Sequence, residues 1–275
     1  MIKLTVLGNN GPYPAPGGAC SGYLVESENA KVVIDMGSGA FANLLKIIED
    51  PEEIDAVILT HLHGDHMSDI FVMRYALELT GRNSKLDRNG KTINTNLYCP
   101  NEPKAEFNLL SAFERFNVIP IHETLQFNVA ELQFSFARMI HGYPCYAVAV
   151  SDGEKKMVFS GDTSWTQDLI LFAEDADLLL IDSNFRESDK RPDKKLAHLT
   201  AWECGIIAGQ ADVTKLLLTH FLPGSELIRF VKEAEMGILK VFENDEGQLW
   251  DSVERTAGYP KIIVEATEIL ATYIV

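Results

Sequence analysis

The sequence has little positive charge, no paired cysteine motif and no long apolar run. Its 24 Lys and Arg residues stand against 40 Asp and Glu, a net charge of −16. This charge argues against a dedicated nucleic-acid surface, because phosphate affinity comes mainly from Lys and Arg, although a local basic patch can still bind phosphate. The four cysteines are scattered without a CxxC pair, so we expect isolated thiols and no disulfide framework. No run approaches the roughly 18 apolar residues that cross a bilayer, and no secretory signal is recognisable, so we expect a cytoplasmic protein without membrane contact.

The composition is that of an ordinary soluble globular chain. Of the 275 residues, 46% are hydrophobic and 23% are charged. α/β domains of this length are often single, and no linker, low-complexity segment or break in composition divides the sequence. We therefore predict one domain over 1–275, with an insertion over 238–258 that contains a short helix at 248–256.

Apolar runs and turn residues predict an α/β fold in which several buried strands end in polar residues. Ligands collect at such strand ends in α/β sheets. The predicted strands are 2–8, 21–36, 56–60, 97–100, 118–121, 125–128 and 132–138 (the last three antiparallel), a hairpin of 145–150 with 156–160, then 178–181, 216–219, 261–264 and 269–275. The predicted helices are 39–49, 67–80, 103–115 and 223–235, and 81–96 is an exposed loop. The loop over 8–18 is rich in Gly and Pro, and it forms either a surface turn or a wall of the active-site mouth.

A cluster of metal-competent side chains follows the apolar run at 56–59. In an extended segment residues i and i+2 point the same way, so His61 and His63 can bind one ion together. Asp65 and His66 lie at the start of the next helix, where they are oriented to hold a second ion. A structural or surface histidine patch is the alternative interpretation.

Three later residues complete the predicted ligand sets. A catalytic zinc has about three protein ligands and an open position. His141 would complete the first site, His220 the second, and Asp162 would bridge both ions through its two oxygens. Taken alone, Asp162 can be a turn aspartate, and the two histidines can be buried core residues. Imidazole and carboxylate without thiolate suit zinc, with manganese or iron as alternatives.

Two ions that share a site favour hydrolysis of phosphodiesters, and of some thioesters and amides. His198 is a candidate general acid for the leaving oxygen, and Asp182 can orient it. His198 can equally lie beside a helix N-cap and pack against Trp202. We count His198, Asp182 and the metal ligand Asp65 as the candidate catalytic residues.

Two other features have open interpretations. Arg186, Lys190, Arg191, Lys194 and Lys195 form the one dense basic stretch, directly before His198. It is either a solvated loop, as the interleaved acidic residues favour, or a lip that receives substrate phosphate. Cys145, four residues after the metal-ligand candidate His141, is either near the site or a small buried hydrophobe.

The stretch His61-Leu62-His63-Gly64-Asp65-His66 resembles the HxHxDH signature of the metallo-β-lactamase superfamily. The resemblance covers most of the chain, roughly 1–235 and the terminal strands. It implies a four-layer αββα sandwich with a dinuclear metal site at one edge. The later pieces occur in the order of the ribonuclease Z-like branch: His141, Gly161-Asp162-Thr163, His198-Leu199-Thr200 and Leu218-Thr219-His220-Phe221.

By this resemblance one metal has three histidine ligands and the other has Asp65, His66 and His220. The three histidines are His61, His63 and His141, and Asp162 bridges the two metals. His198 matches the proposed proton donor of the branch, and Asp182 lies where the branch usually carries a glutamate. True β-lactamases of the superfamily lack the bridging aspartate, which argues against that activity.

One departure from ribonuclease Z concerns its long tRNA-clamping arm. Only 20 residues separate His141 from Asp162, which is enough for a hairpin and not for the arm. We therefore expect a hydrolase with two Zn²⁺ ions that cleaves small-molecule or nucleotide phosphodiesters, with RNA disfavoured and a homodimer expected. The alternatives are tRNA 3′ processing, thioester hydrolysis of glyoxalase II type, and a metal-stabilised binding protein without turnover.

Overall fold

The computed structural model describes residues 1–79, 94–193, 195–243 and 262–275. Its strands are β1 Lys3–Gly8, β2 Gly22–Glu26, β3 Lys31–Met36, β4 Ala56–Ile58, β5 Thr95–Cys99, β6 Phe116–Pro120, β7 Gln126–Val129, β8 Leu132–Met139, β9 Cys145–Ser151, β10 Lys156–Phe159, β11 Leu178–Asp182, β12 Lys215–Thr219, β13 Ile263–Ala266 and β14 Thr272–Ile274. Its helices are α1 Ala40–Leu44, α2 Gly64–Met67, α3 Ile70–Leu79, α4 Lys104–Ser111, α5 Gln167–Ala173, α6 Ala201–Gln210 and α7 Leu227–Val241, with short 3₁₀ helices η1 Pro51–Glu53 and η2 Glu187–Asp189.

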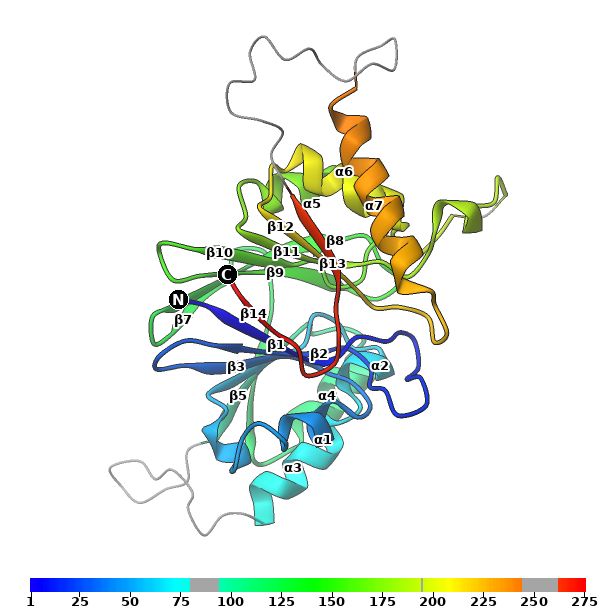
Figure 1. Cartoon of the computed structure of the whole chain (residues 1–275). Coiled ribbons are helices and arrows are strands. Elements are labelled where there is room, and N and C mark those ends of the chain that lie inside the picture. The colour runs from blue at the N-terminus through cyan, green and yellow to red at the C-terminus, as the bar shows by residue number, and fades with distance from the viewer. Residues whose placement is uncertain (80–93, 194, 244–261) are drawn as a thin grey trace.

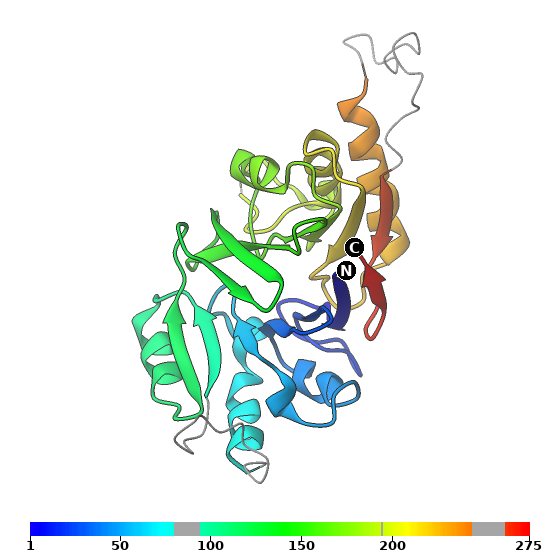
Figure 2. The same cartoon turned by 90° about the vertical axis from the view of Figure 1, so that its left-hand side faces the viewer.

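Two seven-stranded sheets lie face to face, with helices on both outer surfaces (Figure 1). The first sheet has the order β14-β1-β2-β3-β4-β5-β6, and the second has the order β13-β12-β11-β10-β9-β8-β7. Helices α1, α3 and α4 cover the outer face of the first sheet, whereas α5, α6 and α7 cover that of the second (Figures 1 and 2). This is the predicted αββα sandwich.

The strands are apolar on both faces because each sheet is buried on both sides. Val32 and Ile34 of β3 pack between the two sheets, whereas Val33 belongs to the layer shared with α1 and α3. On β12, Leu217 faces the other sheet, and its neighbours Leu216 and Leu218 belong to the layer of α6 and α7. These continuous apolar runs are what made the strands recognisable in the sequence.

Parallel strands bring the predicted polar residues to one edge of the sandwich. β3 and β4 are parallel neighbours in the first sheet, and β10, β11 and β12 are parallel neighbours in the second. The chain segments that follow the carboxyl ends of these strands hold His61, Asp162 and His220, while Asp182 is the last residue of β11. The site therefore draws residues from both sheets.

Some predicted helices are shorter or divided. The helix predicted over 67–80 is divided into α2 and α3, because the N–H of Asp69 bonds to the carbonyl of Met36 and leaves the helical pattern. The Asp69 carboxylate accepts from the N–H groups of Gly39 and Phe41, at 2.9 and 3.0 Å. The helices predicted over 39–49 and 103–115 end at Leu44 and Ser111.

Other differences concern pairing and the predicted insertion. β6 is parallel to β5, not antiparallel, because α4 connects them as a crossover. The insertion predicted over 238–258 is wrong at its start: residues 238–241 form the last turn of α7, where Ile238 packs in the core. Residues 244–258, with the short helix predicted at 248–256, lie outside the described residues, as does most of the loop predicted over 81–96.

The sequence analysis did not predict α5 and α6. Helix α6 contains two glycines, which lower helix propensity. A Cβ on Gly205 would overlap the carbonyl oxygen of Ala234 in α7, so close packing of the two helices requires glycine there.

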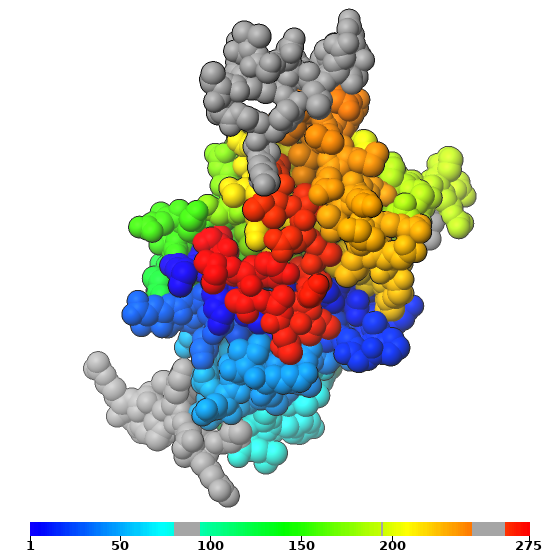
Figure 3. Space-filling model, viewed as in Figure 1, coloured from blue at the N-terminus to red at the C-terminus, as the bar shows by residue number. Residues whose placement is uncertain are grey.

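The segment 263–274 joins the two sheets. β13 pairs in parallel with β12, and β14 pairs antiparallel with β1, so one short stretch completes an edge of each sheet. The hydroxyls of Thr5 and Thr272 lie 3.0 Å apart, and the Asn9 side chain donates to the carbonyl of Thr267 at 2.6 Å. Figure 3 shows this segment in red over the junction of the two halves.

All four cysteines are free thiols in the structure, and all four are buried. Among the described residues, no helix combines the length and the apolarity that crossing a bilayer requires.

Candidate metal centre

The turn after β4 is held by a buried carboxylate. The Asp35 carboxylate accepts a hydrogen bond from the N–H of Thr60 at 2.8 Å and another from its hydroxyl at 2.9 Å. His63 is the N-cap residue of α2, and Asp65 and His66 lie within that helix, as predicted. The predicted cluster is therefore fixed to the end of the first sheet.

The first group of side chains consists of His61, His63, His141 and Asp162, whose ligand atoms all lie within 4.8 Å of one another. Nδ1 of His63 is 2.9 Å from Nε2 of His61 and 3.1 Å from Nε2 of His141. Oδ2 of Asp162 is 3.7 Å from Nε2 of His61 and 3.8 Å from Nε2 of His141. These four residues were predicted to share one ion.

The second group consists of Asp65, His66 and His220. Nε2 of His220 is 3.2 Å from Oδ2 of Asp65 and 3.3 Å from Nε2 of His66. Oδ2 of Asp162 is 3.4 Å from Nε2 of His66 and 3.4 Å from Nε2 of His220. The Asp162 carboxylate thus lies between the two groups.

The donor set fits divalent metal ions. Nitrogen and oxygen atoms converge at 2.9 to 3.8 Å, and Oδ1 of Asp162 is buried without a hydrogen-bond partner among the described residues. Burial of such an atom is costly unless a cation or donor meets it. Burial alone would raise the pKa of Asp162, but His220, His66 and His61 hold it well below the usual value, so the carboxylate is ionised. Imidazole and carboxylate oxygen suit zinc, manganese or iron.

Two further groups orient histidines of the candidate ligand set. Nδ1 of His66 lies 2.7 Å from the Asp35 carboxylate, and Nδ1 of His141 lies 3.2 Å from the carbonyl oxygen of Ala197. Each contact favours a proton on Nδ1 and leaves Nε2 directed at the cluster. The sequence analysis missed Asp35, although it too is a polar residue at the end of an apolar strand.

His198 and Asp182 form the predicted pair. Nδ1 of His198 is 2.8 Å from Oδ2 of Asp182 and 3.8 Å from Oδ2 of Asp162. Burial lowers the pKa of His198, but Asp182 more than offsets this and raises it above the usual value. The N-cap of α6 is Thr200, whose hydroxyl accepts from the N–H of Glu203. The structure therefore places His198 beside the candidate ligand Asp162.

Cys145 lies near the cluster and is also fully buried, so both interpretations of this residue describe its position. Its sulfur is 3.7 Å from Nδ1 of His61, the ring nitrogen that faces away from the other ligand candidates. Burial, with Asp162 and Asp35 nearby, raises the pKa of the thiol well above its usual value. Cys145 is therefore a buried neighbour of His61 on the side away from the other ligand candidates.

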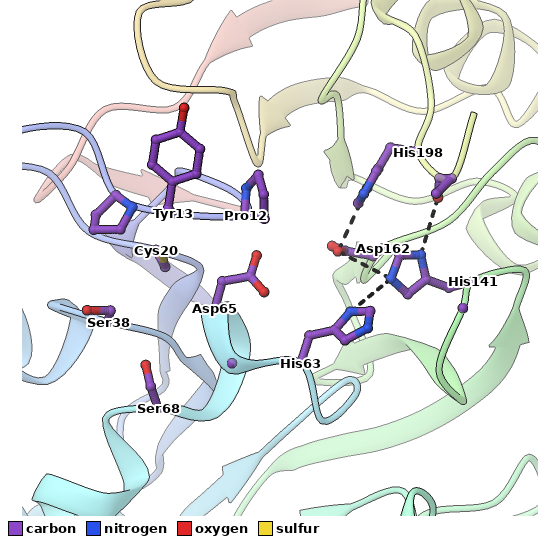
Figure 4. A pocket seen from close by; sticks show the side chains of 14 residues that line it. Pro12, Tyr13, Cys20, Ser38, His63, Asp65, Ser68, His141, Asp162 and His198 are labelled. Carbon is purple, nitrogen blue, oxygen red and sulfur yellow. Dashed lines mark hydrogen bonds and ion pairs between the residues drawn. The ribbon is translucent and has the colours of Figure 1, made fainter. Parts of the chain in front are cut away.

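A cavity of about 670 Å³ opens onto the cluster, and the Gly/Pro-rich loop forms one of its walls. Pro12 and Tyr13 lie on one side of this cavity, and His141 and His198 lie on the other (Figure 4). The loop over 8–18 is thus a wall of the mouth, one of its two predicted roles.

Replacing Gly11 of this loop by alanine should disturb the second group. A Cβ at this position would overlap the imidazole ring of His220. We expect Gly11→Ala to lower the bound metal per chain, measured by elemental analysis of purified protein. Gly142→Ala is the matched control, because a Cβ there meets nothing within 4 Å. Equal metal content in the two variants would contradict this prediction.

Comparisons with known proteins agree with this geometry. A family model described as a beta-lactamase superfamily domain matches residues 30–221. The Bacillus subtilis protein named "Probable metallo-hydrolase YhfI" is 31% identical over 219 residues, which cover 80% of this chain and 86% of that protein. Ribonuclease Z of Ignicoccus hospitalis is 24% identical over 276 residues, covering 84% of this chain and 92% of that protein.

Solved structures agree as well. The crystal structure of YhfI from Bacillus subtilis, titled a metallo-beta-lactamase fold protein, has a TM-score of 0.81 with 25% identity, covering 99% of this chain and 98% of that chain. A diphosphatase of the PhnP family has a TM-score of 0.69 with 15% identity, covering 100% of this chain and 98% of that chain, which shows the shared fold alone.

Proposed function

Because this chain belongs to the β-lactamase superfamily and is one of its metal-dependent hydrolases, we propose that it is a phosphodiesterase acting on small-molecule or nucleotide phosphodiesters. One observation carries the proposal: the His198–Asp182 pair lies beside the carboxylate that separates the two ligand groups. An alkoxide leaving group needs a proton, whereas the thiolate expelled from a thioester does not. A positioned acid therefore favours oxygen esters over the glyoxalase II type of substrate.

The site would hold two zinc ions, one in each group, with Asp162 between them. When bound, such ions polarise the phosphoryl oxygens and lower the pKa of water to about 7. Residues of the chain would orient the ligands and supply the proton. Asp35 and the carbonyl of Ala197 fix the tautomers of His66 and His141, and His198 donates a proton to the leaving oxygen. Asp182 keeps His198 oriented and protonated.

Metal analysis tests the cofactor proposal. We expect about two zinc ions per chain in purified protein, since each group offers about three ligands and the bridging oxygen. Removal by a chelator should abolish hydrolysis of bis-p-nitrophenyl phosphate and lower the melting temperature, and added zinc should restore both. A chain that keeps full activity after complete metal removal would contradict the proposal.

Replacing Asp182 by asparagine should change the pH profile. The carboxylate raises the pKa of His198, so the acid stays protonated, and hydrolysis should fall only as the pH rises through this raised value. In Asp182→Asn the pKa of His198 should drop, and the alkaline limb of kcat should move to lower pH. Since Asp182 also lies 3.3 Å from His220, metal content is measured in parallel. An unmoved alkaline limb at full metal content would exclude His198 as the acid.

The second candidate function is tRNA 3′ processing, which the relatives named ribonuclease Z favour. Two observations weigh against it: the net charge of −16, and the plain hairpin of β9 and β10 between His141 and Asp162. An assay on precursor tRNA at physiological salt separates the two functions. The expected homodimer, the cytoplasmic location and the single domain stay predictions.

A further inference from the structure

A second cavity adjoins the metal centre on the side of His198. It has a volume of about 370 Å³ and shares His198 with the first cavity. Its wall contains the neighbours of three site residues: Ile140 precedes His141, Trp165 follows Asp162 by three positions, and Leu196 lies two positions before His198. The loops that carry the proposed chemistry therefore also build this cavity, which we call the Trp165 pocket.

The Trp165 pocket combines an aromatic wall with positive charge. Trp165 is 39% exposed and Ile140 is 56% exposed, so both offer apolar surface to a ligand. The charged side chains in its lining are Lys190, Arg191, Lys195 and Glu203, together with the titratable His198. In a chain with a net charge of −16, this local excess of cations is unusual.

The cations of the Trp165 pocket differ in whether an acidic side chain pairs with them. Nζ of Lys190 lies 2.9 Å from the Glu187 carboxylate and 2.8 Å from that of Glu203, so these ion pairs compensate one another. Arg191 and Lys195 are exposed, and within the described parts of the chain neither makes an ion pair. These two side chains are available to an anionic ligand.

Geometry assigns a substrate part to each cavity. His198 donates its proton to the leaving oxygen under the proposed function, so the leaving group must lie on the His198 side. The Tyr13 wall lies across the first cavity from His198 and is left for the other ester substituent (Figure 4). The leaving group therefore enters the Trp165 pocket.

We propose that the Trp165 pocket is a leaving-group subsite for a nucleotide whose ring stacks on Trp165 and whose separate phosphate binds Arg191 and Lys195. Bases of any identity stack on aromatic side chains, and Arg and Lys bind phosphate by charge. This inference rests on the proposed phosphodiesterase function. In the reaction, the water oxygen forms the new P–O bond and the P–O3′ bond breaks. O3′ takes the proton of His198, and the proton lost by the water restores His198.

A pair of dinucleotides tests the subsite with the zinc-loaded protein. Hydrolysis of pApA that releases O3′ gives two AMP, whereas ApA gives adenosine and AMP, so the two leaving groups differ only by a phosphate. We expect kcat/KM for pApA to exceed that for ApA by about 10-fold, since two cations meet the added dianion. In Arg191→Gln/Lys195→Gln the preference should approach one. Lys104→Gln/Lys232→Gln removes two exposed lysines that do not line this pocket, and should keep the preference.

Binding provides a readout that does not depend on turnover. By calorimetry, 5′-AMP should bind the wild-type protein about 10-fold more tightly than the double variant Arg191→Gln/Lys195→Gln, and Trp165→Ala should weaken both AMP and adenosine about 10-fold. Equal kcat/KM for pApA and ApA, release of pAp in place of AMP, or unchanged AMP affinity in the variants would overturn the subsite.

The experiments distinguish failure of the proposed phosphodiesterase function from failure of the proposed subsite. If bis-p-nitrophenyl phosphate and both dinucleotides resist the wild-type protein, the phosphodiesterase function is wrong, and the subsite as a leaving-group pocket falls with it. If the wild type cleaves bis-p-nitrophenyl phosphate but treats pApA and ApA alike, the function stands and the subsite is wrong.

Discussion

Asp162→Ala is expected to lose bound zinc and to lower kcat/KM for bis-p-nitrophenyl phosphate by roughly 10³-fold or more, because each bound ion contributes several kcal/mol to transition-state stabilisation. Oδ2 of Asp162 lies 3.7 and 3.8 Å from ligand nitrogens of the first group and 3.4 Å from two ligand nitrogens of the second group. Its loss therefore affects both ion positions at once. The measurement is metal content by elemental analysis together with steady-state kinetics.

His63→Ala should give a comparable loss, since Nδ1 of His63 lies 2.9 Å from Nε2 of His61 and 3.1 Å from Nε2 of His141. The matched control is His122→Ala: His122 is exposed, and its ring nitrogen contacts the hydroxyl of Thr124. That variant should keep wild-type metal content and rate. Full turnover by Asp162→Ala or His63→Ala would show that hydrolysis occurs elsewhere, and the proposed site would be wrong.

His198→Ala should reveal the role of the acid through the leaving group. The rate loss should be about 10²–10⁴-fold for dinucleotides, whose ribose oxygen leaves as a strongly basic alkoxide. For bis-p-nitrophenyl phosphate the loss should be much smaller, since p-nitrophenolate leaves without a proton. The alkaline limb of the pH profile should disappear with the dinucleotide substrate. His198→Ala should retain its metal, because the seven ligand candidates of the two groups are unchanged.

The comparison between substrates is what makes this variant informative. A protein damaged in its folding or metal content would lose both activities by the same factor. An equal loss of rate on the two substrates at full metal content would assign His198 to binding or structure. In that case no proton donor for the leaving oxygen would be identified.

The sequence predicted an α/β fold, and the resemblance to the metallo-β-lactamase superfamily implied the αββα sandwich. Apart from Asp35, the residues predicted to meet are the ones that the structure brings together. Buried strands such as 56–60 and 216–219 were evident because both faces of each sheet are covered. The cluster His61–His66 has a local signature, since strand periodicity places its first two histidines on one side. The partners His141, Asp162 and His220 lie at strand ends, where a polar residue after an apolar run is informative.

What the sequence did not predict depends on tertiary contacts. Helix α6 was missed because Gly205 looks unfavourable for a helix until α7 packs against it. The break between α2 and α3 depends on the N–H of Asp69, which bonds to the carbonyl of Met36 in a segment far from it in the sequence. The role of Asp35 in β3 depends on its contact with His66 of α2, and the Trp165 pocket forms only when three separate loops meet.

The strand pairing of the segment 263–274 has a consequence for synthesis of the protein. β1 has no pairing partner on its β14 side until β14 is synthesised, and Thr272 of β14 lies 267 positions after its partner Thr5. In the same way, β12 lacks its neighbour until β13 is synthesised. A nascent chain therefore leaves the ribosome with an unpaired edge on each sheet, and such edges pair readily with other chains. β1 and β12 gain these neighbours only when 263–274 has emerged, so a ribosome that stalls before this segment would hold a chain whose β1 and β12 edges are open to aggregation.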